Sequence, residues 1–182
     1  MVRIYLVRHG KAASGWGEQN DPGLNDPGRR QSAEVADTLY PLGPIPIVTS
    51  PLLRTRQTAE PLAHKWGVSP RIEAGVAEIP SPPARISDRA AWLRSIMTDE
   101  WHNLESGLQS WRSNVIATLN RLKEDTVVVT HFIAINAAVG EALGDPKVVV
   151  FRPDNTSITI IDTDGACLRL VKKGREDNTI IL

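Results

Sequence analysis

The chain has 182 residues, of which 41% are hydrophobic and 23% are charged, and its 21 basic and 21 acidic side chains give a formal net charge of zero. This length suits one globular domain with a substantial core, and the charge balance argues against a protein that coats nucleic acid or an anionic membrane. A single cysteine excludes an internal disulfide, and no apolar stretch approaches the roughly 20 residues of a membrane span.

The chain opens with an apolar run over residues 2–7, which predicts a buried β-strand. Arg8 and His9 interrupt this run too early for a signal peptide, so we expect a cytoplasmic protein. After a loop rich in Gly, Asn and Asp, Asp26 followed by Pro27 is typical of a helix N-cap and predicts a helix to about residue 39.

Residues 46–49 predict a second strand, and Ser50-Pro51 repeats the cap-plus-proline signal at the start of a second helix. Pro61 should kink or restart that helix, and Gly67 should end it. Residues 71–77 predict a third strand.

Residues 79–107 differ in character, because they combine prolines and tryptophans with charged side chains. We interpret them as an irregular insert with one short helix. The apolar spacing over 110–123 predicts an amphipathic helix. A buried strand over 126–130 follows, and then a helix that ends near Gly144.

The tail has three short runs that predict strands, over 148–151, 157–162 and 167–171. Asp164-Gly165 lies between the last two and is typical of a hairpin turn. The alternation of strands and helices along the chain predicts an α/β protein with a largely parallel sheet, and we expect one domain over residues 1–182.

The ends of four predicted strands carry side chains that suit a single chemistry. Arg8 and His9 follow the first strand, and His131 follows the strand that precedes the last predicted helix. Arg54 lies one helical turn after the second strand, and Glu78 lies near the end of the third. Because functional groups gather at the carboxyl ends of strands in open α/β sheets, these five side chains should share one rim.

Phosphoryl transfer through a phosphohistidine accounts for each of them. His9 is suited to attack phosphorus and carry the phosphoryl group. Arg8 and Arg54 suit the non-bridging oxygens, and His131 is suited to donate a proton to a further oxygen. Glu78 is placed to protonate the leaving alcohol and then to accept a proton from the water that releases His9. The cations are guanidinium and imidazolium groups, so neither a metal nor a cofactor is expected.

The chain resembles the histidine phosphatase superfamily, also called phosphoglycerate mutase-like. The matching motifs span most of the chain: Val7-Arg8-His9-Gly10, Leu24-Asn25 with Gly28 and Gln31, the run from Ser50 to Ala59, Ala77-Glu78, and Val128-Val129-Thr130-His131. The resemblance implies a three-layer sandwich whose central, largely parallel sheet is flanked by helices. It also implies His9 as the phosphorylated histidine, Arg8 and Arg54 as phosphate ligands, His131 as the second pocket histidine and Glu78 as the proton donor.

The sequence departs from the family pattern at two places. Phe132 follows the second histidine, where many members have Gly, and the run from Lys11 to Ser14 lacks an Asn that touches phosphate in mutases. Ser14 or Lys11 is suited to substitute as a phosphate ligand. The chain is also shorter than the cofactor-dependent mutases. These features favour a phosphatase that acts on a small phosphorylated metabolite or a phosphoprotein.

Three other functions stay open. The first two alternatives are a phosphoglycerate mutase-type phosphotransferase and a phosphohistidine-protein phosphatase. The chain is also compatible with a binding protein for a phosphorylated ligand that has lost turnover. A metal site on His9 and His131 is disfavoured, since neither carboxylates nor cysteines cluster with them.

The insert over 79–107 is expected to cover the pocket and to select the leaving group. Asp88 and Glu105, both within it, are rivals of Glu78 as the acid. Its arginines either bind a second anionic group of the substrate or form surface salt bridges with Asp88 and Glu100; they are Arg85, Arg89 and Arg94. The oligomeric state cannot be predicted from this sequence.

Overall fold

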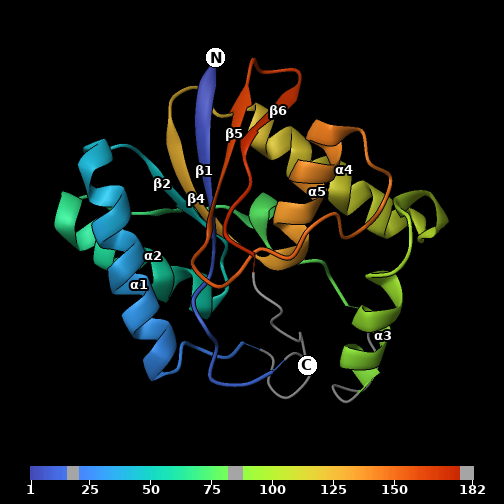
Figure 1. Cartoon of the computed structure of the whole chain (residues 1–182), viewed down its shortest axis with the longest axis horizontal. Coiled ribbons are helices and arrows are strands. Elements are labelled where there is room, and N and C mark those ends of the chain that lie inside the picture. The colour runs from blue at the N-terminus through green and yellow to red at the C-terminus, as the bar shows by residue number, and fades with distance from the viewer. Residues whose placement is uncertain (16–20, 82–87, 177–182) are drawn as a thin grey trace.

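The computed structural model describes residues 1–15, 21–81 and 88–176. These residues build a six-stranded sheet in the order β3-β2-β4-β1-β5-β6. The first four strands of this order are mutually parallel, whereas β5 runs antiparallel to β1 and β6 antiparallel to β5. The expected α/β architecture with a largely parallel sheet is therefore confirmed (Figure 1).

Strands and helices alternate through most of the chain. The strands are β1 (Val2–Arg8), β2 (Ile47–Thr49), β3 (Arg71–Ile72), β4 (Thr126–Thr130), β5 (Ile158–Thr163) and β6 (Leu168–Lys172). The α-helices are α1 (Asp26–Leu39), α2 (Leu53–Trp66), α3 (Arg89–Ile96), α4 (Ser106–Asn120) and α5 (Phe132–Leu143). Short 3-10 helices cover Tyr40–Leu42, Ala74–Val76 and Trp101–Asn103.

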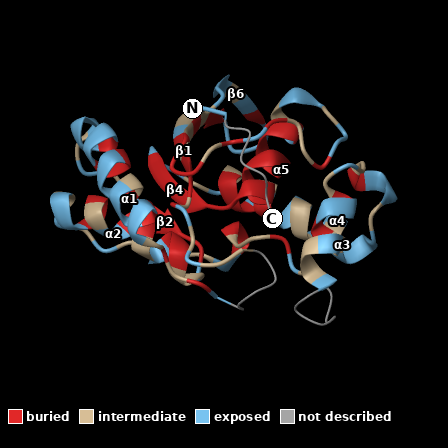
Figure 2. Cartoon of the chain, turned by 60° about the horizontal axis from the view of Figure 1, so that its bottom comes forward, coloured by how far each residue is buried: buried red, intermediate tan, exposed pale blue. Residues whose placement is uncertain are grey.

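Helices cover both faces of the sheet, which gives three layers. Successive side chains of a strand point to opposite faces, and β1 shows this directly: Val7 packs with α1 and α2, whereas Leu6 packs with α4 and α5. Burial is concentrated in the sheet and in α5, while α1 and α2 keep exposed outer surfaces (Figure 2). The sheet is thus held rigidly between two apolar layers.

Several predicted boundaries are confirmed by the structure. The strand over 126–130 matches β4, and the hairpin at Asp164-Gly165 joins β5 to β6, with Gly165 at φ 95°. Gly67 and Gly144 end α2 and α5 in the left-handed conformation that favours glycine.

Other boundaries differ from the prediction. Asn25, not Asp26, is the N-cap of α1, because its side chain accepts a hydrogen bond from Gly28 N at 2.8 Å. Helix α2 begins at Leu53 and runs through Pro61 without a restart. Its packing against α1 and the sheet outweighs the proline's lost hydrogen bond.

Two predicted strands are largely absent. Only Arg71–Ile72 of the third predicted strand is extended, because the Glu73 side chain accepts from Gly75 N at 3.0 Å and turns the chain into a 3-10 helix. Residues 148–151 form no strand. The Asn136 side chain accepts from the backbone N–H groups of Val150 and Phe151 instead of a neighbouring strand.

The insert contains α3 and the 3-10 helix Trp101–Asn103, and the helix predicted over 110–123 begins earlier, at Ser106. Within the described ranges, no helix is long and apolar enough to span a bilayer.

Candidate active site

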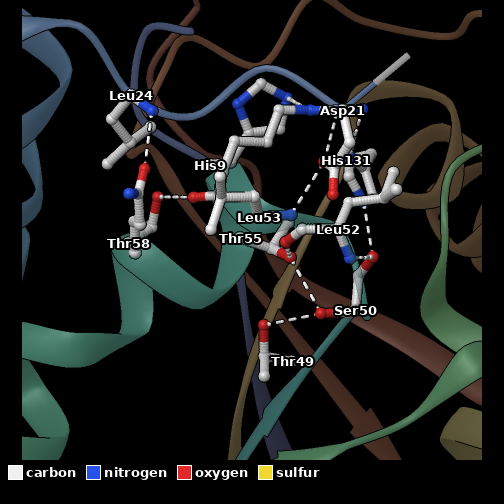
Figure 3. Close-up of polar contacts among 12 residues, drawn as sticks. His9, Asp21, Leu24, Thr49, Ser50, Leu52, Leu53, Thr55, Thr58 and His131 are labelled. Atoms are coloured by element: carbon white, nitrogen blue, oxygen red, sulfur yellow. Dashed lines mark hydrogen bonds and ion pairs between the residues drawn. The ribbon is translucent and has the colours of Figure 1, made fainter.

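The parallel strands β2, β4 and β1 are neighbours, so their carboxyl ends deliver side chains to the same edge of the sheet. Ser50 follows β2, His131 follows β4, and His9 follows β1. Two backbone bonds extend the ladder beyond the strands, from His9 N to Thr130 O at 3.0 Å and from Ser50 N to Val129 O at 3.1 Å. Figure 3 shows His9, His131 and Ser50 gathered beside the start of α2.

The His9 ring is held at both nitrogens. Its Nδ1 lies 2.7 Å from Gly10 O, and its Nε2 accepts a hydrogen bond from Arg54 Nε at 3.2 Å. A guanidinium group only donates, so Nε2 must carry a lone pair and the proton of the neutral ring must sit on Nδ1, where it donates to Gly10 O. This arrangement leaves the lone pair of the neutral ring on Nε2.

The His131 ring carries its proton on the other nitrogen. Its Nδ1 lies 3.2 Å from an N–H group of Arg54, and its Nε2 lies 2.8 Å from Ser50 Oγ (Figure 3). By the same reasoning, Nδ1 accepts from Arg54 and Nε2–H donates to the Ser50 hydroxyl. His131 must therefore gain a proton at Nδ1 before that nitrogen can donate to a phosphoryl oxygen.

Burial and positive charge keep both imidazoles neutral. Burial lowers the pKa of His131 well below 6.5, and the nearby Arg54 guanidinium lowers it further. The pKa of His9 is lowered in the same way, first by burial and then by Arg54 and Arg8. The ring centroids lie 5.2 Å apart in an edge-on arrangement. A neutral His9 is the form that a nucleophile requires.

Arg54 joins the two histidines and is itself positioned by Asp21. The Asp21 carboxylate accepts from Leu53 N at 2.8 Å, at the first turn of α2, and lies 3.9 Å from a terminal nitrogen of Arg54. The Arg54 side chain is buried, so its charge acts in a region with little water. Asp21 was not among the predicted site residues, although it lies in the polar loop that precedes α1.

Arg8 is held by a backbone carbonyl and by an aromatic ring. One terminal nitrogen donates to Pro153 O at 2.9 Å, and the guanidinium carbon lies 5.3 Å from the centroid of the Phe132 ring. A guanidinium over an aromatic face is a favourable cation–π contact. Phe132, which replaces the more common Gly, therefore supports Arg8 at the start of α5.

Glu78 follows the 3-10 helix Ala74–Val76 and turns its carboxyl toward the start of α5. Its oxygens accept from Ile79 N at 3.0 Å and from Ile133 N at 3.4 Å. Burial raises the pKa of Glu78, and this outweighs the two backbone donors and the charges of Arg54 and Arg8, which lower it. A carboxyl with a raised pKa is suited to hold a proton for a leaving group.

Asp88 and Glu105, the rival acids, are exposed at the N-cap positions of α3 and α4. The Ser14 hydroxyl is buried and has no hydrogen-bond partner among the residues that the structure describes. Of the insert arginines, Arg94 is exposed on α3, and Arg85 lies outside the described residues. The expected partner Glu100 instead lies 3.2 Å from a ring nitrogen of His102.

Besides Asp21, three further supporting residues were missed by sequence reasoning. Ser50 was interpreted as a helix cap and as the end of the second strand, but it was given no role in the site. Thr58 lies within the family motif, and its hydroxyl accepts from Gly10 N at 3.0 Å. Asn155 donates to His9 O at 2.8 Å from a loop that no pattern in the sequence marked as part of the site.

Comparison with known proteins gives a consistent picture. The profile of the histidine phosphatase superfamily (branch 1) matches residues 4–175. A curated protein named probable phosphoglycerate mutase GpmB, from Enterobacter sp. (strain 638), is 30% identical over 185 residues, which cover 89% of this chain and 85% of that protein. Its namesake from Erwinia tasmaniensis is 28% identical over 184 residues, with the same shares covered.

Solved structures share the fold. A mycobacterial glucosyl-3-phosphoglycerate phosphatase in complex with VO3 has a TM-score of 0.74 at 23% identity, covering 97% of this chain and 100% of that chain. A phosphoserine phosphatase from Entamoeba histolytica in complex with 3-phosphoglyceric acid has a TM-score of 0.73 at 21% identity, covering 99% and 100%.

Proposed function

Because the chain belongs to the histidine phosphatase superfamily (branch 1), we propose that it is a phosphomonoester hydrolase that acts through a phosphohistidine on His9. One observation supports this most directly. His9 Nδ1 is bound to Gly10 O, and Nε2 accepts from Arg54, a group that binds phosphoryl oxygens well. A phosphoryl group bound between His9 Nε2 and the Arg54 guanidinium would contact both the nucleophile and the cation that stabilises its oxygens.

In the first half-reaction, His9 Nε2 attacks phosphorus and the bond from phosphorus to the ester oxygen breaks. Arg54 and Arg8 stabilise the charge on the non-bridging oxygens. Glu78 gives its proton to the ester oxygen, so a neutral alcohol leaves and a carboxylate remains. When the substrate draws Arg54 to its oxygens, His131 Nδ1 loses its donor, takes up a proton from solvent water and donates it in a hydrogen bond to a phosphoryl oxygen.

In the second half-reaction, water attacks the phosphoryl group and the bond from phosphorus to Nε2 breaks. The Glu78 carboxylate takes a proton from that water, which restores the acid for the next cycle. Ser50 keeps its bond to His131 Nε2 throughout. Ser14, whose buried hydroxyl has no partner within the described ranges, is a candidate ligand for the phosphoryl group. Guanidinium charge serves where other phosphatases use a metal ion.

The apolar packing of the insert supports a role at the entrance of the site. Ile79, Leu93 and Trp101 of the insert pack against Phe132 and Ile133, the first two residues of α5. The insert therefore contacts the residues directly after His131. We propose that it covers the pocket and selects a small phosphorylated metabolite as the substrate.

A phosphotransferase is the second candidate, because the curated relatives carry the name of a phosphoglycerate mutase. A mutase returns the phosphoryl group from the histidine to another hydroxyl, whereas a hydrolase passes it to water. Incubation with a phosphoglycerate separates the two. A hydrolase releases inorganic phosphate, whereas a mutase moves the phosphoryl group between the hydroxyls of the substrate.

The test of the proposed function is hydrolysis of p-nitrophenyl phosphate between about pH 4 and pH 9, with a chelator present. Wild type should turn over, His9→Ala should not, and the control variant His64→Ala, on the exposed last turn of α2, should match wild type. Tight phosphate binding without turnover would instead indicate a binding protein, and loss of activity with the chelator would indicate a metal site.

A further inference from the structure

The peptide bond between His9 and Gly10 is gripped from both sides. Its carbonyl accepts from Asn155 Nδ2 at 2.8 Å, and its N–H donates to Thr58 Oγ1 at 3.0 Å. Asn155 is 6% exposed and Thr58 is 2% exposed, so neither bond competes with bulk water. Side chains from the loop before β5 and from α2 thus fix the plane of one peptide.

This peptide controls the hydrogen bond that orients the His9 ring. The next carbonyl, Gly10 O, accepts from His9 Nδ1 at 2.7 Å. Gly10 is also wedged against α1, because a Cβ on it would lie 2.7 Å from Gly28 O. Gly10 O belongs to the next peptide, whose N–H, on Lys11, donates to Gln31 Oε1 at 2.9 Å, so side chains hold the peptides on both sides of Gly10.

A strained residue, Thr156, follows Asn155 and holds the backbone of this loop in place. Thr156 has φ 54°, a left-handed conformation that β-branched residues rarely adopt. Its N–H donates to Arg8 O at 2.9 Å, and its hydroxyl donates to Asn155 O at 2.7 Å. Strain of this kind persists where the surrounding structure over-determines it, and it is concentrated at functional sites.

We propose that Asn155 and Thr58 are positioning residues that set the tautomer of His9 by clamping the His9–Gly10 peptide. The clamp keeps Gly10 O against Nδ1, so the proton stays on Nδ1 and the lone pair stays on Nε2. Neither residue touches the phosphoryl group. The inference rests on the proposed function, because a fixed tautomer matters only if Nε2 is the nucleophile.

The tautomer can be measured without turnover. Ring ¹⁵N shifts in protein labelled at its four histidines, assigned with His9→Ala, report which nitrogen carries the proton. In wild type, Nδ1 of His9 should be protonated and Nε2 should carry the lone pair. A wild-type His9 protonated at Nε2 would overturn the clamp, whatever the activity of the protein.

Two isosteric variants remove one arm of the clamp each. Asn155→Asp removes the donor to His9 O, and Thr58→Val removes the acceptor of Gly10 N. Each should shift His9 toward a mixture of tautomers and lower kcat for p-nitrophenyl phosphate about tenfold, the effect of one lost hydrogen bond, with KM within about threefold. Thr58→Ser keeps the hydroxyl and should restore both the shifts and most of kcat.

The control is Asn120→Asp in α4. The Asn120 amide donates a hydrogen bond of 3.0 Å to Ala166 O, and this bond does not involve the strand ends that carry the site. It should leave kcat and the His9 shifts at the wild-type values. If Asn155→Asp and Thr58→Val also leave both unchanged, the clamp is wrong. If wild type shows the expected tautomer but no turnover that depends on His9, the proposed function fails and the clamp remains as a structural feature.

Discussion

Two neutral histidines, the half-buried His9 and the fully buried His131, should make the stability of the free protein depend on pH, and His131 isolates the effect. Its ring is fully buried, and burial and Arg54 lower its pKa well below 6.5. The unfolded chain binds a proton at this ring near pH 6.5, whereas the folded chain does not, so the unfolded state gains protons on acidification. Stability is therefore complete above about pH 6.5 and declines as the pH falls below it.

The size of the loss follows from the linkage relation. With a folded pKa below the window, His131 costs about 1.4 kcal/mol of unfolding free energy between about pH 7.5 and pH 5.5, and His9 costs up to the same amount. Glu78 opposes them. Because its pKa is raised, the folded protein binds a proton at Glu78 at a higher pH than the unfolded chain does. The contribution of Glu78 to the unfolding free energy therefore increases as the pH falls through the raised pKa toward 4.5.

Urea unfolding at the two pH values, for wild type and His131→Gln, checks this prediction. The variant lacks the titrating ring, so its loss on acidification should be smaller than that of wild type by about 1.4 kcal/mol. His64→Gln, on the exposed last turn of α2, should keep the wild-type loss. An equal loss in wild type and His131→Gln would refute the neutral, buried state of this ring.

Three further changes probe packing and proton transfer. Gly28→Ala places a Cβ 2.1 Å from Lys11 O and should cost at least about 2 kcal/mol in urea unfolding, whereas Gly107→Ala meets no atom within 4 Å and should stay within about 1 kcal/mol of wild type. Leu119→Ala, in the core, should cost about 2–5 kcal/mol by the same assay and keep kcat/KM where the protein is folded. For phenyl phosphate, kcat should fall as the pH rises through the raised pKa of Glu78, because ionisation removes the proton for the leaving group. Glu78→Gln should abolish this limb and lower kcat by about 10²–10⁴-fold.

The parallel topology explains why most of the site could be predicted from the sequence. Alternating strands and helices placed β1, β2 and β4 in one sheet, and parallel strands present their carboxyl ends at the same edge. His9, Arg54 and His131 are therefore joined in the structure as expected from their positions at strand ends. The insert was predicted by its composition, because prolines disfavour regular elements.

The supporting interactions could not be predicted, since they depend on contacts between distant segments. Asn155 reaches His9 across 146 residues, from a loop whose path is set by the positive φ of Thr156. The apolar run over 148–151 had a strand-like pattern, but Asn136 satisfies its backbone and outweighs that preference. Sequence periodicity describes local preference and does not report such long-range partners.

The central claim, a phosphoryl group carried on His9, is tested most directly by trapping it in Glu78→Gln. p-Nitrophenol leaves with little help from an acid, whereas release of the phosphoryl group by water requires the Glu78 carboxylate, so the intermediate should accumulate. The variant is mixed with p-nitrophenyl phosphate labelled at phosphorus and quenched in alkaline detergent. We expect an acid-labile label on the peptide that contains His9. The double variant that combines Glu78→Gln with His9→Ala should carry no label. Steady phosphate release without label on this peptide, or label that persists with His9→Ala, would contradict the account.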